Sequence, residues 1–355
     1  MTLTDLVAAI GPPDPRAAAA AQRRLDELTK PPGSLGRLEA LAVRLAAITG
    51  RPSIVERPVI FTFAADHGVA AEGVSAYPQS VTAQMLENFL AGGAAINVLA
   101  RQAGARLVVA DFGVVGPVVA SRGVHSRRRG PGTSNMVTGA AMSRADAVGA
   151  IEDGAALCAS VLGEDGADLV GIGEMGIANT TAASAIAAVL TGVDPARVTG
   201  AGTGIDAGAI ARKVAVIRRA LAVNRPDPHD PLGVLAKVGG FEIAGLVGVI
   251  LAAAARRTPV ALDGFISGTA ALVAARLAPD AKHVLFASHV SAEPGHRVVL
   301  DDLGLHPYLD LGMRLGEGTG AALFVHLARA ATRVTSEMAT FKSAGVDGRR
   351  EGDRV

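Results

Sequence analysis

Residues 59–64, VIFTFA, form a short apolar run that is followed by a helix-length segment over residues 81–100. The same rhythm continues along the chain. Further runs of apolar or β-branched residues, separated by helix-length segments, lie at 106–112, 168–172, 259–262 and 283–287. Strands that alternate with helices predict a parallel sheet covered by helices on both faces. We therefore expect an α/β, doubly wound fold with ligands at the carboxyl ends of the strands.

The two ends of the chain lie outside this rhythm. The first fifty residues are predicted to form helices interrupted by a turn at 30–36, KPPGSLG, where proline and glycine cannot continue a helix. We predict that residues 1–57 and 311–342 pack together as a small helical domain beside an α/β domain of residues 58–310. Residues 343–355 lack apolar periodicity and are expected to form a flexible tail.

The composition favours a globular protein that acts on small molecules. A net charge of +1, 19% charged residues and 3% aromatic residues with no Trp provide no surface for nucleic acid or an anionic membrane. The longest apolar run, 243–255, is shorter than the roughly 20 residues of a membrane span. A single cysteine, Cys158, excludes an internal disulfide framework, and the N-terminus does not read as a signal peptide, so a cytoplasmic location is expected.

A glycine-rich loop follows the predicted strand at 168–172, where residues 171–181 read GIGEMGIANTT. Gly173 and Gly176 would let the backbone approach a ligand, and the next helix, capped at Asn179 or Thr180, would present free amides to an anion. A second cluster at 200–206, GAGTGID, contains Gly202 and precedes a helix that carries Lys213. Together these segments predict a phosphate site.

Two other interpretations of the first loop are a simple tight turn and a dinucleotide site. Against the dinucleotide, Glu174 would place a carboxylate beside a pyrophosphate, and Asp194 precedes Pro195 instead of ending a strand. A mononucleotide phosphate is the preferred hypothesis.

A third glycine-rich segment lies near the C-terminus, where residues 311–320 read LGMRLGEGTG. Glu317, flanked by glycines, would come close to a substrate, and burial beside apolar surface would raise its pKa as a general base requires. The alternative is a glutamate that merely stabilises the start of the following helix.

Six motifs, taken together, resemble the nicotinate-nucleotide:dimethylbenzimidazole phosphoribosyltransferases of cobalamin lower-ligand synthesis, and the resemblance spans almost the whole chain. The motifs are KPPGSLG at 30–36, AADHGV at 64–69, YPQSVT at 77–82, GEMGIANTT at 173–181, GGFE at 239–242 and RLGEG at 314–318. The resemblance implies a homodimer, a Rossmann-like parallel sheet with a smaller helical domain, and Glu317 as the catalytic base.

The resemblance also implies which residues meet each substrate. Facing the nucleotide are Glu174, Gly176, Gly202 and Lys213. The segment from Tyr77 to Met85, including Ser80 and Gln84, would line the benzimidazole pocket together with Leu315.

The implied reaction moves ribose phosphate from nicotinate mononucleotide to 5,6-dimethylbenzimidazole. The leaving group already carries a pyridinium nitrogen, so neither a metal nor a cofactor is expected. Attack by the benzimidazole creates a cation whose proton Glu317 would take, and Glu174 would stabilise positive charge at the ribose. The alternatives are a nucleotide-binding regulatory protein, in which Glu317 is only a cap, and an NAD-dependent dehydrogenase.

Three other groups of polar residues are weighed against this reaction. Asp301 and Asp302 resemble a magnesium-dependent pyrophosphoryl-ribose motif, but the following residues cannot wrap a phosphate. A zinc site at His289, Glu293 and His296 would be interrupted by Pro294 and Gly295, so hydrogen-bonded structural roles are preferred. Residues 66–67, Asp-His, follow the first strand, and a role near the substrate is as well supported as a structural one.

Overall fold

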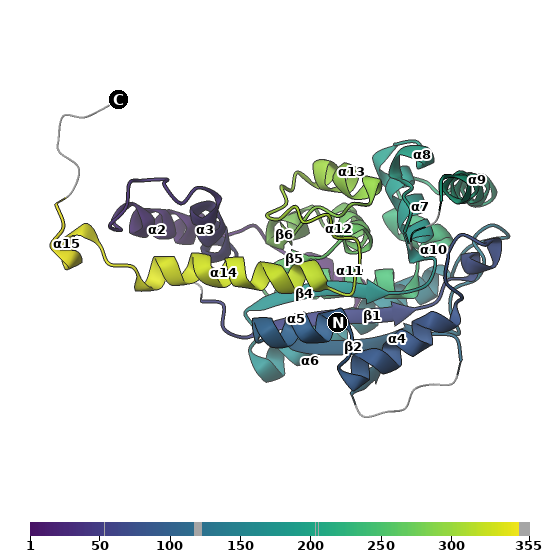
Figure 1. Cartoon of the computed structure of the whole chain (residues 1–355), viewed down its shortest axis with the longest axis horizontal. Helices are drawn as coiled ribbons and strands as arrows, with labels where there is room; N and C mark the ends of the chain where they lie inside the picture. Colours follow the sequence, from purple (N-terminus) through teal and green to yellow (C-terminus); the bar gives the residue numbers. More distant parts are fainter. Residues whose placement is uncertain (53, 117–122, 203, 205, 348–355) are drawn as a thin grey trace.

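The computed structural model describes residues 1–52, 54–116, 123–202, 204 and 206–347, and its strands form one six-stranded sheet (Figure 1). The strands are β1 (Pro58–Ala65), β2 (Arg106–Gly113), β3 (Val124–Ser126), β4 (Leu169–Met175), β5 (Val260–Leu262) and β6 (Leu285–Ala287). Every neighbouring pair is parallel, and the order is β3-β2-β1-β4-β5-β6. This is the doubly wound Rossmann order, in which the direction of winding reverses between β1 and β4. The predicted fold class is confirmed.

The central strand β1 is buried on both sides, as its continuous apolar sequence predicts. Ile60 and Ala64 pack against α4 (Ser80–Ala91), α5 (Ala95–Ala103) and α14 (Thr319–Glu337). The alternate side chain Phe63 stacks on Phe112 of β2 with ring centroids 4.5 Å apart, under α11 (Phe241–Ala255). The two faces of one strand thus lie under two separate helical layers.

The remaining helices cover the faces and the ends of the sheet. They are α1 (Leu3–Ala8), α2 (Pro15–Asp26), α3 (Arg37–Thr49), α6 (Arg144–Asp165), α7 (Asn179–Thr191), α8 (Pro195–Val198), α9 (Ala207–Asn224), α10 (Pro231–Val238), α12 (Phe265–Leu277), α13 (Pro294–Leu303) and α15 (Phe341–Ala344), with 3-10 turns η1 (Gly68–Glu72) and η2 (Pro279–Val284). The single helix expected over 81–100 is instead α4 and α5, because Gly92 ends α4 in a left-handed conformation.

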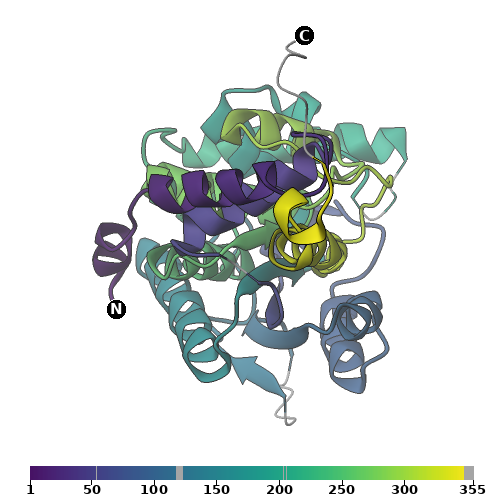
Figure 2. The same ribbon diagram turned by 90° about the vertical axis from the view of Figure 1, so that its left-hand side faces the viewer.

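The two ends of the chain meet along α14. The first half of α14 packs on β1, β4 and β5, whereas its far end lies beside α2 and α3 (Figures 1 and 2). Arg24 of α2 donates hydrogen bonds to the carbonyl oxygens of Thr335 and Met338, and Leu28 forms an antiparallel bridge with Thr340. A separate domain built from both ends stays a prediction, since α14 belongs to the sheet layer as well. Of the expected tail, residues 348–355 lie outside the described residues.

Cys158 lies on the buried side of α6. Burial raises the pKa of its thiol to about 12, so it stays protonated. Among the described helices, none combines the length and the apolar character that a bilayer crossing demands.

Candidate active site

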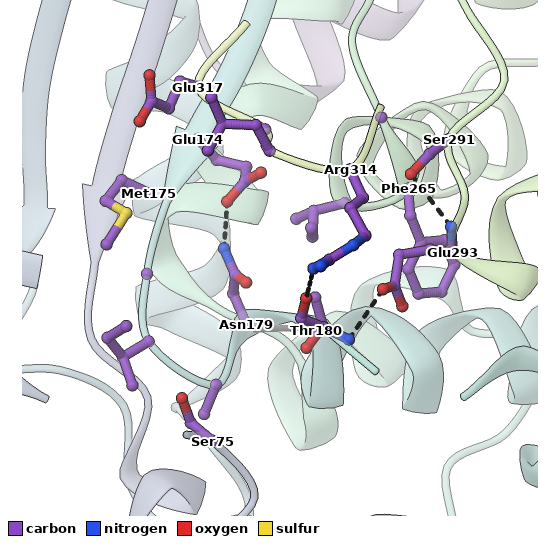
Figure 3. Close-up of a pocket in the computed structure, with 18 of the residues that line it drawn as sticks. Ser75, Glu174, Met175, Asn179, Thr180, Phe265, Ser291, Glu293, Arg314 and Glu317 are labelled. Carbon is purple, nitrogen blue, oxygen red and sulfur yellow. Dashed lines mark hydrogen bonds between the residues drawn. The ribbon is translucent and has the colours of Figure 1, made fainter. Parts of the chain in front are cut away.

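A cavity of about 700 Å³ opens at the carboxyl ends of β4, β5 and β6 (Figure 3). This is the edge of the sheet where doubly wound folds bind ligands. Of the predicted site residues, the cavity brings together Tyr77, Met85, Glu174, Gly176, Asn179, Thr180, Gly202, Leu315 and Glu317. The glycine-rich segments at 171–181, 200–206 and 311–320, far apart in sequence, therefore converge on one site.

Glu317 sits on a turn with unusual backbone geometry. Three successive residues have positive φ, with 87° at Gly316, 64° at Glu317 and 97° at Gly318. Glycine adopts this region freely, but for glutamate it is uncommon and costs energy. Two hydrogen bonds hold the backbone of Glu317 itself: its amide donates to the Glu174 carbonyl at 3.2 Å, and the Thr62 hydroxyl donates to the Glu317 carbonyl at 2.6 Å.

The Glu317 carboxylate lines the cavity but is itself only 4% exposed. Burial raises its pKa, and a hydrogen bond from the Ile96 amide to Oε2, at 3.2 Å, acts in the opposite direction. Ile96 lies in the first turn of α5, whose positive end faces the carboxylate. The side chain is thus oriented by one helix and desolvated by its surroundings, which suits a general base.

Glu174, at the end of β4, is buried beside other acids. Burial, then the charges of Glu242 and Asp263, raises its pKa well above the ordinary value. Its carboxyl accepts a short hydrogen bond from the Asn179 side chain, which is visible in Figure 3. Burial and the neighbouring acids therefore disfavour the negative charge that was expected at Glu174.

Polar groups suited to an anion gather at the opposite side of the cavity. The Lys213 ammonium donates to the Thr180 hydroxyl at 2.6 Å, and a side chain at Gly202 would begin only 3.2 Å from that ammonium. Burial lowers the pKa of Lys213 to about 8, and the charge of Glu293 acts in the opposite direction. Arg314 donates to the Gly202 carbonyl at 2.9 Å (Figure 3). Lys213 itself stands behind Thr180 and does not line the cavity.

The start of α7 differs slightly from the prediction. The helix begins at Asn179, and its cap is Ala178 in a left-handed conformation. Asn179, expected as one of two possible caps, instead donates its side-chain amide to Glu174. The positive end of α7 still faces the cavity, as an anion site requires.

The residues expected around the acceptor are only partly at the cavity. Tyr77, Met85 and Leu315 line it, whereas Ser80 and Gln84 of α4 do not. Gly173 lies behind the Glu317 turn, because a side chain there would come within 2.0 Å of the Gly318 nitrogen. The structure places Gly173 as a support for the turn.

The pair at 66–67 has structural partners. His67 Nε2 lies 2.6 Å from Oε1 of Glu242, and both side chains are buried. Asp66 Oδ2 accepts a hydrogen bond from the Val115 amide at 2.7 Å. Neither residue lines the cavity.

Several cavity residues were not predicted as ligand contacts. Arg314 lies inside the RLGEG motif but was not identified as a ligand contact. Glu293 was considered only as a metal ligand, and its Oε1 accepts a hydrogen bond from the Gly202 amide at 2.8 Å.

The residues considered as a metal site have other partners. Nδ1 of His296 accepts a hydrogen bond from the Ser291 amide at 2.9 Å. Across the described residues, no group of three or more His, Cys, Asp or Glu side chains is arranged to hold a metal ion.

Comparisons with known proteins agree with this geometry. The model of a phosphoribosyltransferase family, DBI_PRT, matches residues 10–346. A Roseiflexus sp. (strain RS-1) protein named nicotinate-nucleotide–dimethylbenzimidazole phosphoribosyltransferase is 56% identical over 351 residues, covering 98% of this chain and 99% of that relative. The chain belongs to this family.

Other family members extend the match. The Desulforudis audaxviator relative of the same name is 56% identical, covering 95% of this chain and 96% of its own. The crystal structure of CobT from Thermus thermophilus superposes with a TM-score of 0.91 at 47% identity, covering 94% of this chain and all of that one. The resemblance found in the sequence is confirmed, and the match to the family covers almost the whole chain.

Proposed function

We propose that this chain transfers the 5-phosphoribosyl group of nicotinate mononucleotide to 5,6-dimethylbenzimidazole, releasing nicotinate and alpha-ribazole 5'-phosphate for the cobalamin nucleotide loop. The observation that carries the proposal is the placement of a buried, cavity-lining carboxylate, Glu317, opposite an anion site at Thr180 and Gly202. The names of the relatives support the same reaction.

The substrates fit the two sides of the cavity. The 5'-phosphate would lie at the start of α7, near the amides of that turn, Thr180, Gly202 and the Lys213 ammonium. The flat benzimidazole would lie against Tyr77, Met85 and Leu315. Fixing both partners in one cavity lowers the barrier by roughly 7 to 11 kcal/mol in favourable cases.

The chemistry follows from these positions. A benzimidazole nitrogen forms a bond to C1′ of the ribose, and the bond from C1′ to the pyridinium nitrogen breaks, with its electron pair returning to neutralise the nicotinate ring. The product benzimidazolium then loses the proton on its other nitrogen to the Glu317 carboxylate. A raised pKa makes Glu317 a stronger base for this step.

Glu174 would respond to the substrate. Its acid neighbours and its burial favour the protonated form in the free protein. The pyridinium and the cationic transition state bring positive charge into the cavity, which favours ionisation of Glu174. We infer that Glu174 stabilises the ribose cation only once the donor is bound.

The test is a chromatographic assay of nicotinate release and of the new riboside phosphate, with excess chelator present. Wild-type protein should form product, because the leaving group needs no metal, and Glu317→Gln should bind nicotinate mononucleotide but lose turnover. If the nucleotide binds and no benzimidazole yields product, a regulatory nucleotide-binding protein becomes the better hypothesis. Tight binding of NAD in place of the mononucleotide would favour a dehydrogenase.

We also propose, from the sequence and its resemblance to the family, that the protein is a homodimer and lies in the cytoplasm. Light scattering of the purified protein should give twice the 35.7 kDa chain mass. A monomer that turns over at full rate would contradict the dimer.

A further inference from the structure

Asp263 directly follows β5 and is fully buried behind the Glu317 turn. Its Oδ2 accepts a hydrogen bond from the Gly318 amide at 2.9 Å, and its Oδ1 accepts one from the Gly320 amide at 2.7 Å. Both carboxylate oxygens of one side chain are therefore committed to the turn that carries Glu317.

These two amides lie at the start of α14, where the first N–H groups of a helix lack partners within the helix. The residue at the cap position is Gly318, which has no side chain to accept them. Asp263 supplies that acceptor from the position directly after β5, and its carboxylate faces the positive end of α14. The helix is capped by a residue more than fifty positions away in sequence.

The Asp263 cap fixes the C-terminal side of a turn whose backbone conformation is energetically unfavourable. Glu317 and its two glycine neighbours all have positive φ, and the upstream side is held by the Glu174 carbonyl and the Thr62 hydroxyl. Without Asp263, the Gly318 and Gly320 amides would be buried without an acceptor, and the turn would relax toward an ordinary helical start.

Asp263 makes this pair of hydrogen bonds in surroundings that are unfavourable for a carboxylate. The pKa of Asp263 is raised to about 7, mainly by burial and also by the charge of Glu317, although the hydrogen bonds from the Gly318 and Gly320 amides act in the opposite direction. His289, which follows β6, places Nδ1 3.9 Å from Oδ1. Asparagine would fit the same space but would turn an N–H donor toward one of the two amides.

We propose that Asp263 is a positioning residue that holds the Glu317 carboxylate in its reactive orientation by capping α14. This rests on the proposed role of Glu317 as the base. Asp263 itself does not line the cavity, so it acts through the turn and not on the substrate.

The experiment is a double-mutant cycle with Asp263→Asn and Glu317→Gln in the full chain, read as kcat and KM for both substrates. A misplaced base lowers kcat by on the order of 100-fold, so Asp263→Asn should reach that loss with little change in the KM for nicotinate mononucleotide. The double variant should be no slower than Glu317→Gln alone, because the two residues act as one unit.

Ser288→Ala is the matched control. The buried Ser288 hydroxyl donates to the Leu262 carbonyl and, at 3.5 Å, to the backbone carbonyl of Asp263, and it lies 3.2 Å from Nδ1 of His289. It makes no hydrogen bond to the Asp263 carboxylate or to the turn. Its kcat should stay within about twofold of wild type. Asp263→Ser provides a second variant with a side chain too short to reach both amides.

The outcomes separate the two proposals. If Glu317→Gln turns over like wild type, the base role itself fails. If Glu317→Gln keeps only a low residual rate and the losses of the two variants multiply, or if Asp263→Asn keeps wild-type kcat, the positioning role alone is overturned. Hydrogen exchange of the wild-type Gly318 and Gly320 amides gives an independent test: slow exchange supports the cap, and exchange as fast as an open loop overturns it.

Discussion

Lys213 shows how burial can set the pH range of a binding site. Its ammonium is 1% exposed, and burial lowers its pKa to about 8. In the free protein the proposed phosphate site therefore loses its buried cation near pH 8. A bound phosphate dianion would stabilise the ammonium and raise this pKa again.

We expect kcat/KM for nicotinate mononucleotide to fall above about pH 8, because this ratio reports groups that ionise in the free protein. The kcat value should stay level over the same range. Lys213→Met should lower kcat/KM by about 10- to 100-fold, equivalent to losing one charge-assisted hydrogen bond, and should remove the alkaline decline. Initial rates from pH 6 to 10 measure both.

Lys282→Met is the control for this prediction, since Lys282 is exposed and does not line the cavity. It should preserve the wild-type pH profile. An unchanged alkaline decline in Lys213→Met would assign that ionisation to another group.

Residues were predictable where a motif and a strand end coincide. Glu174 lies in a glycine-rich segment directly after a predicted strand, Glu317 lies in a glycine-rich segment before a predicted helix, and the structure brings both to one cavity. Asp263 also follows a predicted strand, at residues 259–262, so the strand-end rule could have identified it. Its bonds to Gly318 and Gly320 could not have been foreseen, because they depend on how β5 and α14 meet in space.

At the scale of elements, β4 and the Glu317 turn lie in direct backbone contact. A side chain at Gly173 would come within 2.0 Å of the Gly318 nitrogen and 2.3 Å of the Glu317 carbonyl carbon. Strand and turn can touch only because this position carries no Cβ.

Gly173→Ala should therefore push the turn away from β4. We expect a stability loss of about 1 to 3 kcal/mol from overpacking, together with a fall in kcat of the order of 100-fold. Thermal unfolding and steady-state rates of the same preparation measure the two effects. Gly139→Ala, where nothing lies within 4 Å of the new methyl group, should change neither. A Gly173→Ala protein that melts earlier but keeps its kcat would show that the turn does not move.

Strand positions were more predictable than helix boundaries. Five of the strands overlap the predicted apolar runs, because buried parallel strands have a strong and local sequence signal. Strand β3, with the sequence Val-His-Ser, lies at the edge of the sheet and is only partly buried, so it lacks the apolar run that marks the other strands. The split between α4 and α5 depends on the conformation of Gly92.

At the scale of the whole molecule, α14 joins the turn that carries Glu317 to both ends of the chain. It starts at Thr319, passes over the sheet, and ends beside α2, where Arg24 binds the Thr335 and Met338 carbonyls. An element shared in this way should couple the helical ends to the α/β sheet.

We expect calorimetry to show one cooperative unfolding transition and not two. Arg24→Ala removes two hydrogen bonds from a charged donor, so it should lower the midpoint of that single transition by a few degrees while leaving kcat unchanged. A separate early transition that Arg24→Ala shifts by itself would instead show that the ends form an independent domain.

The buried thiol of Cys158 has a practical consequence for labelling experiments on this protein. The chain contains no other cysteine and no tryptophan, and a buried thiol with a pKa of about 12 does not react with ordinary labels. A cysteine introduced at exposed Leu315 would be the one reactive site for a fluorophore or spin label. A tryptophan in place of Tyr77 would be the one indole, so its emission would report substrate entry at the cavity mouth without background from the rest of the molecule.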